Sequence, residues 1–157
     1  MKILLLQIDK TQDSYLTNGI EIYTKRLKNY CSFEIQTINV PKTVRQRTQP
    51  EQKQEEAKLI LLNILPEDQL ILLDEKGKEY SSLDFSNFIA QKQNASVKRL
   101  IFLIGGPFGF SDVIYKRANL KISLSQMTFS HQMVRLFFVE QLYRAFTILK
   151  GEKYHHE

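Results

Sequence analysis

The sequence predicts an α/β fold with a mainly parallel sheet and helices on both faces. Short apolar runs typical of buried strands alternate along the chain with stretches of helical period. The runs at residues 2–8, 69–74 and 99–104 are almost wholly apolar, as expected for strands that are covered on both faces. A chain of 157 residues with 43% hydrophobic residues is long enough for one domain, residues 1–157, with its own core.

The first elements follow from composition and spacing. Residues 2–8 form a buried strand. Residues 13–30 form an amphipathic helix because their apolar side chains recur at helical spacing. Residues 33–40 have strand composition with partial alternation.

A basic polar segment, residues 41–53, separates these elements from the rest. It has no apolar period, so a mobile loop is predicted there. A helix follows, with Pro50 in its first turn, and runs to about residue 64. The loop carries four cations that are candidates for contact with RNA: Lys42, Arg45, Arg47 and Lys53.

The remaining elements alternate in the same way. Strands are predicted at residues 69–74, 99–104 and 120–125, and helices at 82–94, 111–118 and 131–149. The sequence EKGK after residue 74 turns the chain, and Ser82 is placed to cap a helix. The longest helix presents an inner stripe of Val134, Phe137, Phe138, Gln141, Leu142, Ala145 and Ile148.

Composition narrows the function classes. The 22 Lys and Arg residues outnumber the 17 Asp and Glu residues, and a net charge of +5 favours polyanionic partners, although an ordinary soluble surface carries such a charge too. Cys31 is the single cysteine, so no intrachain disulfide can form, which suits a reducing cytosol. No apolar run is long enough for a membrane span or a signal peptide.

Three strand exits are expected to meet at one edge of the sheet, the usual ligand site of such folds. They are Leu73–Asp74, Ile104–Gly106 and residues 123–125. The sequence GGPFG in the second exit is either a tight turn or a place where a ligand touches the backbone. It lies too late in the chain for a dinucleotide fingerprint and lacks the lysine of a P-loop.

The histidines are the candidate acids and bases. His131, His155 and His156 all lie near the C-terminus, and no supporting ligand set indicates a metal site. His131 could instead be a helix-start residue with a local hydrogen bond. Arg135 and Glu140 do not share one helix face cleanly and could both be solvated. These residues alone indicate a basic α/β protein with a pocket built late in the chain, but they name no reaction.

The sequences LIGGPFGFS and LSQMTFSHQMVRLFFVEQLYRAFTILKGEKYHHE resemble the bacterial large-subunit ribosomal RNA methyltransferase H family. Its members are pseudouridine N3-methyltransferases of the SPOUT class. The opening MKI strand and the LLDEKGK turn match as well, so the resemblance covers the whole chain. One departure lies in the tail, where this chain has His156 and many members have a basic residue.

The resemblance implies a C-terminal trefoil knot over about residues 100–157. It implies a cytoplasmic homodimer that binds S-adenosyl-L-methionine and methylates a pseudouridine of 23S rRNA in the assembled 70S ribosome. The matching cofactor residues are Leu73, Gly105, Leu124, Ser125, Gln126, Met127, Thr128 and Phe129.

The resemblance also implies a substrate side. His131, Arg135, Tyr154 and His155 match the residues that line it. From these we expect His131 or His155 to take the N3 proton, and Arg135 to stabilise charge on the uracil or to hold a phosphate. Two alternatives stay open: a non-catalytic ribosome- or RNA-binding protein of the same fold, and a SPOUT enzyme that acts on transfer RNA.

Overall fold

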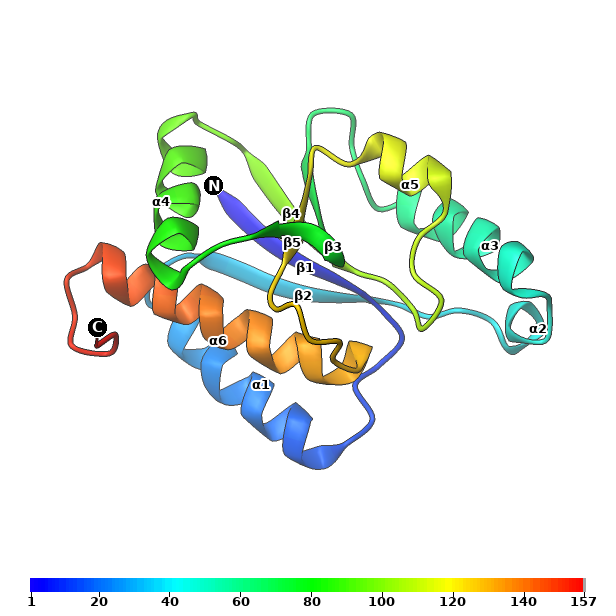
Figure 1. Cartoon of the computed structure of the whole chain (residues 1–157), viewed down its shortest axis with the longest axis horizontal. Coiled ribbons are helices and arrows are strands. Elements are labelled where there is room, and N and C mark those ends of the chain that lie inside the picture. The colour runs from blue at the N-terminus through cyan, green and yellow to red at the C-terminus, as the bar shows by residue number, and fades with distance from the viewer. Residues whose placement is uncertain (157) are drawn as a thin grey trace.

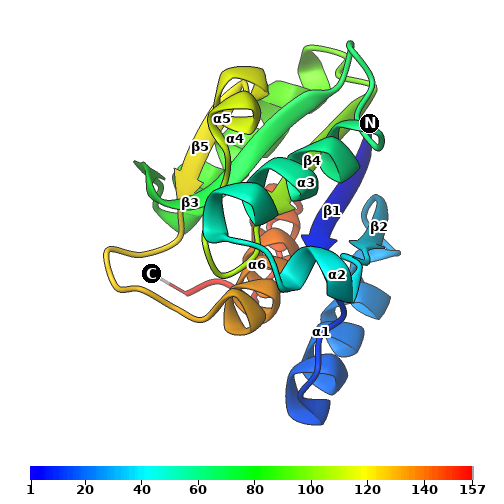
Figure 2. The ribbon, with the colours of Figure 1, turned by 90° about the vertical axis from the view of Figure 1, so that its right-hand side faces the viewer.

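Five parallel strands form one sheet in the order β2-β1-β4-β3-β5 (Figures 1 and 2). The computed structural model describes residues 1–156; Glu157, the last residue of the YHHE tail, lies outside them. The strands are β1 (Lys2–Ile8), β2 (Ser32–Ile38), β3 (Gln69–Glu79), β4 (Arg99–Ile104) and β5 (Leu120–Ser123). In Figure 2 the arrowheads of β1 and β5 point the same way, toward the start of α6. The predicted parallel α/β fold is confirmed.

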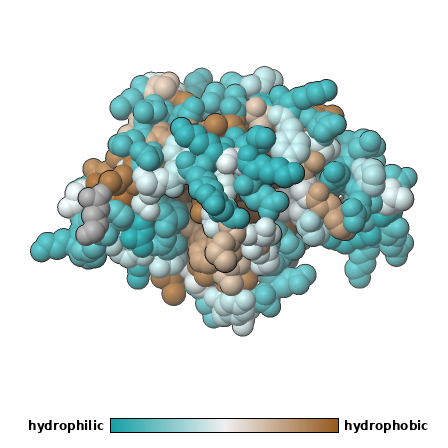
Figure 3. All heavy atoms as spheres, viewed as in Figure 1, coloured by the Kyte–Doolittle hydropathy of each residue, from teal (hydrophilic) through white to brown (hydrophobic). Residues whose placement is uncertain are grey.

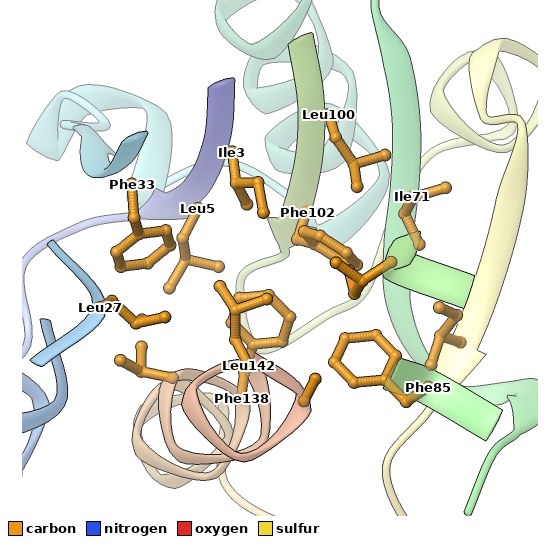
Figure 4. Packing of buried hydrophobic residues seen from close by; sticks show 14 of the residues in the cluster. Ile3, Leu5, Leu27, Phe33, Ile71, Phe85, Leu100, Phe102, Phe138 and Leu142 are labelled. Atoms are coloured by element: carbon orange, nitrogen blue, oxygen red, sulfur yellow. The ribbon is translucent and has the colours of Figure 1, made fainter. Parts of the chain in front are cut away.

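Helices cover both faces of the sheet. The helices on one face are α1 (Ser14–Leu27), α4 (Ser82–Asn94) and α6 (His131–Leu149). Those on the other face are α2 (Lys42–Arg45), α3 (Gln49–Leu61) and α5 (Asp112–Arg117). Successive side chains of a strand point to opposite faces. Ile3 and Leu5 therefore join the core under α6 (Figure 4), while Leu4 and Leu6 pack against the α3 side.

The prediction of a mobile loop over residues 41–53 is wrong. That segment contains α2 and the start of α3. Glu51 accepts hydrogen bonds from the backbone N–H of Thr48 at 3.0 Å and from its hydroxyl at 2.8 Å, which fixes the start of α3. Pro50 lies in the first turn as expected, and α3 ends at Leu61 rather than near residue 64.

The predicted EKGK turn lies within one long strand, β3, and most of it belongs to an irregular segment, residues 74–77, called the excursion below. Leu73 and Lys78 both pair with Ile122 of β5, so residues 74–77 leave the ladder and the strand then resumes. Gly77 lies against the backbone of Ile122: a Cβ on Gly77 would be 2.6 Å from the Ile122 nitrogen. A side chain does not fit there, and the excursion depends on this glycine.

Several element ends and faces differ from the sequence predictions. Ser81, not Ser82, caps α4, because its Oγ accepts from the Asp84 N–H at 3.0 Å. The strand predicted to reach residue 125 ends at Ser123. On α6 the predicted stripe is partly wrong, since Phe137 is 39% exposed while Arg135 and Val139 are buried.

On one face of the molecule the hydrophobic side chains lie in small patches (Figure 3). Figure 3 shows hydrophilic residues over most of the face seen in Figure 1. Within residues 1–156, every helix is too short or too polar to cross a membrane. The trefoil knot and the single-domain organisation stay predictions, although all five strands belong to one sheet.

Candidate active site

The exits of β3 and β4 enclose a cavity of about 500 Å³. This volume is in the range of small-molecule sites. The GGPFG turn forms one wall and the excursion after Leu73 forms another. The helices add Gln49 of α3, Tyr115 of α5, and His131 and Val134 of α6. The predicted convergence of these strand exits is therefore present in the structure.

A smaller cavity of about 50 Å³ adjoins it at the exit of β5. The two share Leu73, Asp74, Glu75 and Val134, so they form one groove, called the exit groove below. The β5 side is lined by Ser123, Leu124, Ser125, Met127 and Phe129. The remaining predicted cofactor residues, Gln126 and Thr128, do not line the groove and point elsewhere: the Gln126 amide lies 3.4 Å from Glu79, and Thr128 donates to Glu75 at 2.8 Å.

The acidic residues of the excursion hold the groove together. Asp74 accepts a hydrogen bond from the Tyr115 hydroxyl at 2.6 Å and another from the Lys76 N–H at 2.8 Å. Burial, and then this bond to Asp74, raise the pKa of Tyr115 to about 12, so the phenol stays protonated and donating. The Thr128 bond to Glu75 ties the excursion to the loop after β5.

The GGPFG turn uses its glycines for close packing. A Cβ on Gly105 would be 2.9 Å from the ring of Phe110, which folds back into the core. Gly109 has a φ of +76°, the left-handed conformation that suits glycine, and its N–H donates to the Gly106 carbonyl. Phe108 also lines the groove and is 39% exposed. The two phenylalanines therefore differ in burial: Phe110 belongs to the core, and Phe108 lies at the surface of the groove.

His131 is the ionisable ring at the groove. It is the first residue of α6, whose cap is Ser130. Burial lowers the pKa of His131 below its usual 6.5, and the positive charges of Arg135 and Arg45 lower it further. The imidazole is therefore neutral near pH 7 and able to accept a proton.

Arg135 does not line the exit groove, contrary to its predicted place beside the substrate. Its side chain is 0% exposed. Nη2 donates to the Ile8 carbonyl at 2.6 Å and Nη1 to the Thr11 hydroxyl at 3.0 Å. Burial lowers its pKa to about 10, so it remains charged at neutral pH. In this chain Arg135 joins α6 to the exit of β1, which is a positioning role.

Tyr154 and His155 also lie away from the groove within one chain. The Tyr154 hydroxyl donates to Glu140 at 3.0 Å and lies 3.3 Å from the Tyr23 hydroxyl. Nδ1 of His155 lies 3.5 Å from Nη1 of Arg144. With a rise of 1.5 Å per residue, Arg144 lies roughly 20 Å along α6 from His131. The tail thus folds back on α6, and the chain alone does not bring His155 to the groove.

The four predicted RNA-contacting cations lie on α2 and α3 and the turn between them. Arg45 pairs with Asp9, and Arg47 lies 3.5 Å from Glu55. Lys42 is exposed and Lys53 is half-buried. The group is therefore held by helices instead of moving with a loop.

Sequence reasoning missed several groove residues. Glu75 and Lys76 directly follow a predicted strand exit, so their position in the chain was a usable signal. Tyr115 and Val134 carried no such signal, because only tertiary packing brings them to the groove.

Comparison with known proteins points to one family. A family model described as "Predicted SPOUT methyltransferase" matches residues 1–155. The chain is 55% identical over 157 residues to the ribosomal RNA large subunit methyltransferase H of Flavobacterium psychrophilum, with all of both chains covered. It is 58% identical to the protein of the same name from Cytophaga hutchinsonii, covering 99% of this chain and 100% of that one.

Proposed function

Because the chain belongs to the SPOUT methyltransferase family, we propose that it methylates N3 of a pseudouridine in 23S rRNA of the assembled ribosome. The relatives named above are similar along their whole length, so their activity is the first candidate for this chain. The observation that carries the proposal is the exit groove, where the matching residues of β3, β4 and β5 meet beside a neutral histidine.

SPOUT methyltransferases use S-adenosyl-L-methionine, and the groove has the features that such a cofactor requires. Leu73, Leu124 and Val134 offer apolar surface to an adenine ring, while the polar backbone of the loop after β5 can bind its edge. When bound, the cofactor supplies a methyl group activated by its sulfonium. The residues that would hold it are Leu73, Gly105, Leu124, Ser125, Met127 and Phe129, with Gln126 and Thr128 shaping the loop.

His131 is the proposed general base. Methylation at N3 requires loss of the N3 proton, and a neutral imidazole on the groove wall can accept it. Positioning supplies much of the remaining rate, because nitrogen and methyl donor must meet in line. Arg135 supports this step indirectly, because its hydrogen bond to Ile8 ties α6, one turn beyond His131, to the end of β1.

A homodimer is part of the proposal. Met127 is 74% exposed beside the groove, and Phe137 is 39% exposed, with its ring centroid 4.8 Å from that of Phe129. Covering this apolar surface favours association of two copies. In such a dimer the tail of one chain could reach the groove of the other, which would give Tyr154 and His155 a substrate role that the single chain lacks.

The substrate side follows from charge. Lys42, Arg45, Arg47 and Lys53 supply cations for phosphate contact, and we propose that the dimer recognises ribosome shape and phosphates more than a long base sequence. We propose that the protein acts in the cytoplasm, on the 70S ribosome.

Transfer of labelled methyl groups tests the proposal. Purified protein and labelled S-adenosyl-L-methionine are incubated with 70S ribosomes, naked 23S stem-loop RNA or transfer RNA from a strain lacking the gene. We expect label in 23S rRNA of 70S ribosomes and much less in naked RNA. Equal activity on naked RNA contradicts the shape requirement, and label in transfer RNA alone contradicts the substrate. Calorimetric titration with S-adenosyl-L-methionine separates an enzyme from a non-catalytic binder. Absence of binding heat at micromolar cofactor would indicate the non-catalytic binder.

A further inference from the structure

A second cavity of about 600 Å³ lies at the exits of β1 and β2. Its lining at the strand exits consists of Ile8, Asp9, Lys10 and Gln12 after β1, Asn39 and Val40 after β2, and Lys42 and Arg45 of α2. It shares Gly106, Pro107 and His131 with the exit groove. The two cavities therefore lie on either side of the GGPFG turn and the first residue of α6. We call the second one the β1–β2 pocket.

The floor of this pocket is held rigidly. Asp9 has a φ of +57°, a left-handed backbone conformation that is uncommon for a residue other than glycine. Its N–H donates to Ile38 at 2.8 Å, and its Oδ1 accepts from the Val40 N–H at 3.1 Å. These bonds lock the exits of β1 and β2 together.

The first two turns of α6 also bind the end of β1 and the segment after it, residues 8–12. Gln132 accepts from the Gln12 N–H at 3.0 Å, and its amide lies 3.4 Å from the Lys10 carbonyl. Arg135 donates to Ile8, directly before Asp9. The helix that carries His131 is thus anchored to the pocket floor, and strained, over-determined loops of this kind are typical of binding sites.

The pocket is positively charged. Its one carboxylate, Asp9, is neutralised by Arg45. Lys10 and Lys42 are exposed at the pocket, and within residues 1–156 neither makes an ion pair. The Asn39 side chain is exposed as well and offers one donor and one acceptor group. Two free ammonium groups beside an amide suit a phosphate attached to a polar base.

We infer that the β1–β2 pocket binds the nucleotide that receives the methyl group, with its phosphates on Lys10 and Lys42. The inference rests on the proposed function for the identity of the RNA. The sheet edge then divides into two halves: β3, β4 and β5 face the cofactor, and β1 and β2 face the nucleotide. His131 belongs to both walls, as required of a base that takes a proton from a nucleotide poised toward the cofactor.

A matched pair of double variants tests this division. Lys10→Ala/Lys42→Ala removes the two pocket charges. Lys28→Ala/Lys98→Ala removes two exposed lysines next to the starts of β2 and β4, at the opposite sheet edge. We expect the pocket variant to raise KM for 70S ribosomes at least tenfold and to lower the salt slope of binding by about one per lysine. Its affinity for S-adenosyl-L-methionine should stay within twofold of wild type, and the control should match wild type throughout.

Equal KM values for the two double variants overturn the inference, because charge alone would then explain any effect. So does a parallel loss of cofactor affinity in the pocket variant. A second measurement is independent of rRNA methylation: amide chemical shifts of the full chain titrated with uridine 5′-monophosphate. Shifts at Lys10, Asn39 and Lys42 support the pocket even if the rRNA activity is absent, and shifts confined to other regions overturn it.

Discussion

Arg135 donates a 2.6 Å hydrogen bond from Nη2 to the backbone carbonyl of Ile8, the last residue of β1. Its guanidinium is fully buried, and the same side chain bonds Thr11. We predict that Arg135→Met lowers the free energy of unfolding by roughly 1–3 kcal/mol, because the Ile8 carbonyl loses its buried partner. Urea denaturation measures this, with Lys28→Met, an exposed residue at the end of α1, as a control expected to change little. Unchanged stability with a large loss of kcat would instead assign Arg135 a direct chemical role.

The lowered pKa of His131 predicts the pH dependence of methyl transfer. Protonation removes the base, so kcat/KM should be flat above pH 7 and should fall as pH drops through a pKa below 6.5. His131→Ala should lower kcat by roughly 100-fold or more at saturating cofactor. His156→Ala, in the exposed tail, is the control. If His131→Ala and His155→Ala both keep near wild-type turnover, neither histidine is the base.

Gly77 should tolerate no side chain. In Gly77→Ala the new methyl group would meet the Ile122 backbone at 2.6 Å, so the excursion after Leu73 must shift. We expect a loss of roughly 1–3 kcal/mol in unfolding free energy and weaker binding of S-adenosyl-L-methionine by calorimetry. Gly19→Ala is the contrasting variant, since its methyl group meets only the flexible end of Leu136 and gains helix propensity. Wild-type cofactor affinity in Gly77→Ala would show that the excursion does not shape the cofactor site.

The Tyr154 hydroxyl anchors the C-terminal tail to α6. Burial, together with its bonds to Tyr23 and Glu140, raises the pKa of the phenol, so it keeps its proton and donates to Glu140. Tyr154→Phe should speed amide hydrogen exchange over residues 150–156 and cost about 1 kcal/mol of stability. Tyr15→Phe, at a residue that is 62% exposed, should change neither. Unaltered exchange in Tyr154→Phe would mean that other contacts hold the tail.

Local patterns predicted the features that depend on neighbouring residues. The bounds of α6 and of β4 agree with the sequence predictions, because both have strong apolar patterns and clear ends. The meeting of the strand exits followed from parallel connectivity alone. The loop prediction for residues 41–53 failed because this segment is polar, and Val44 is its contribution to the hydrophobic core.

Features that depend on distant partners could not be predicted. Arg135 has the composition of a surface or catalytic residue, and its burial depends on Ile8 and Thr11 at the other end of the chain. The return of β3 to the ladder depends on pairing with β5. The distance of His155 from the groove depends on how the tail folds against α6. Each is a tertiary contact that no local period encodes.

Nucleoside mass spectrometry of 23S rRNA tests the central claim most directly. The rRNA is taken from the source strain, from a strain lacking this gene, and from that strain carrying the gene again. The proposed function predicts that N3-methylpseudouridine disappears from 23S rRNA on deletion and returns on complementation. Persistence of the modified nucleoside in the deletion strain would contradict it.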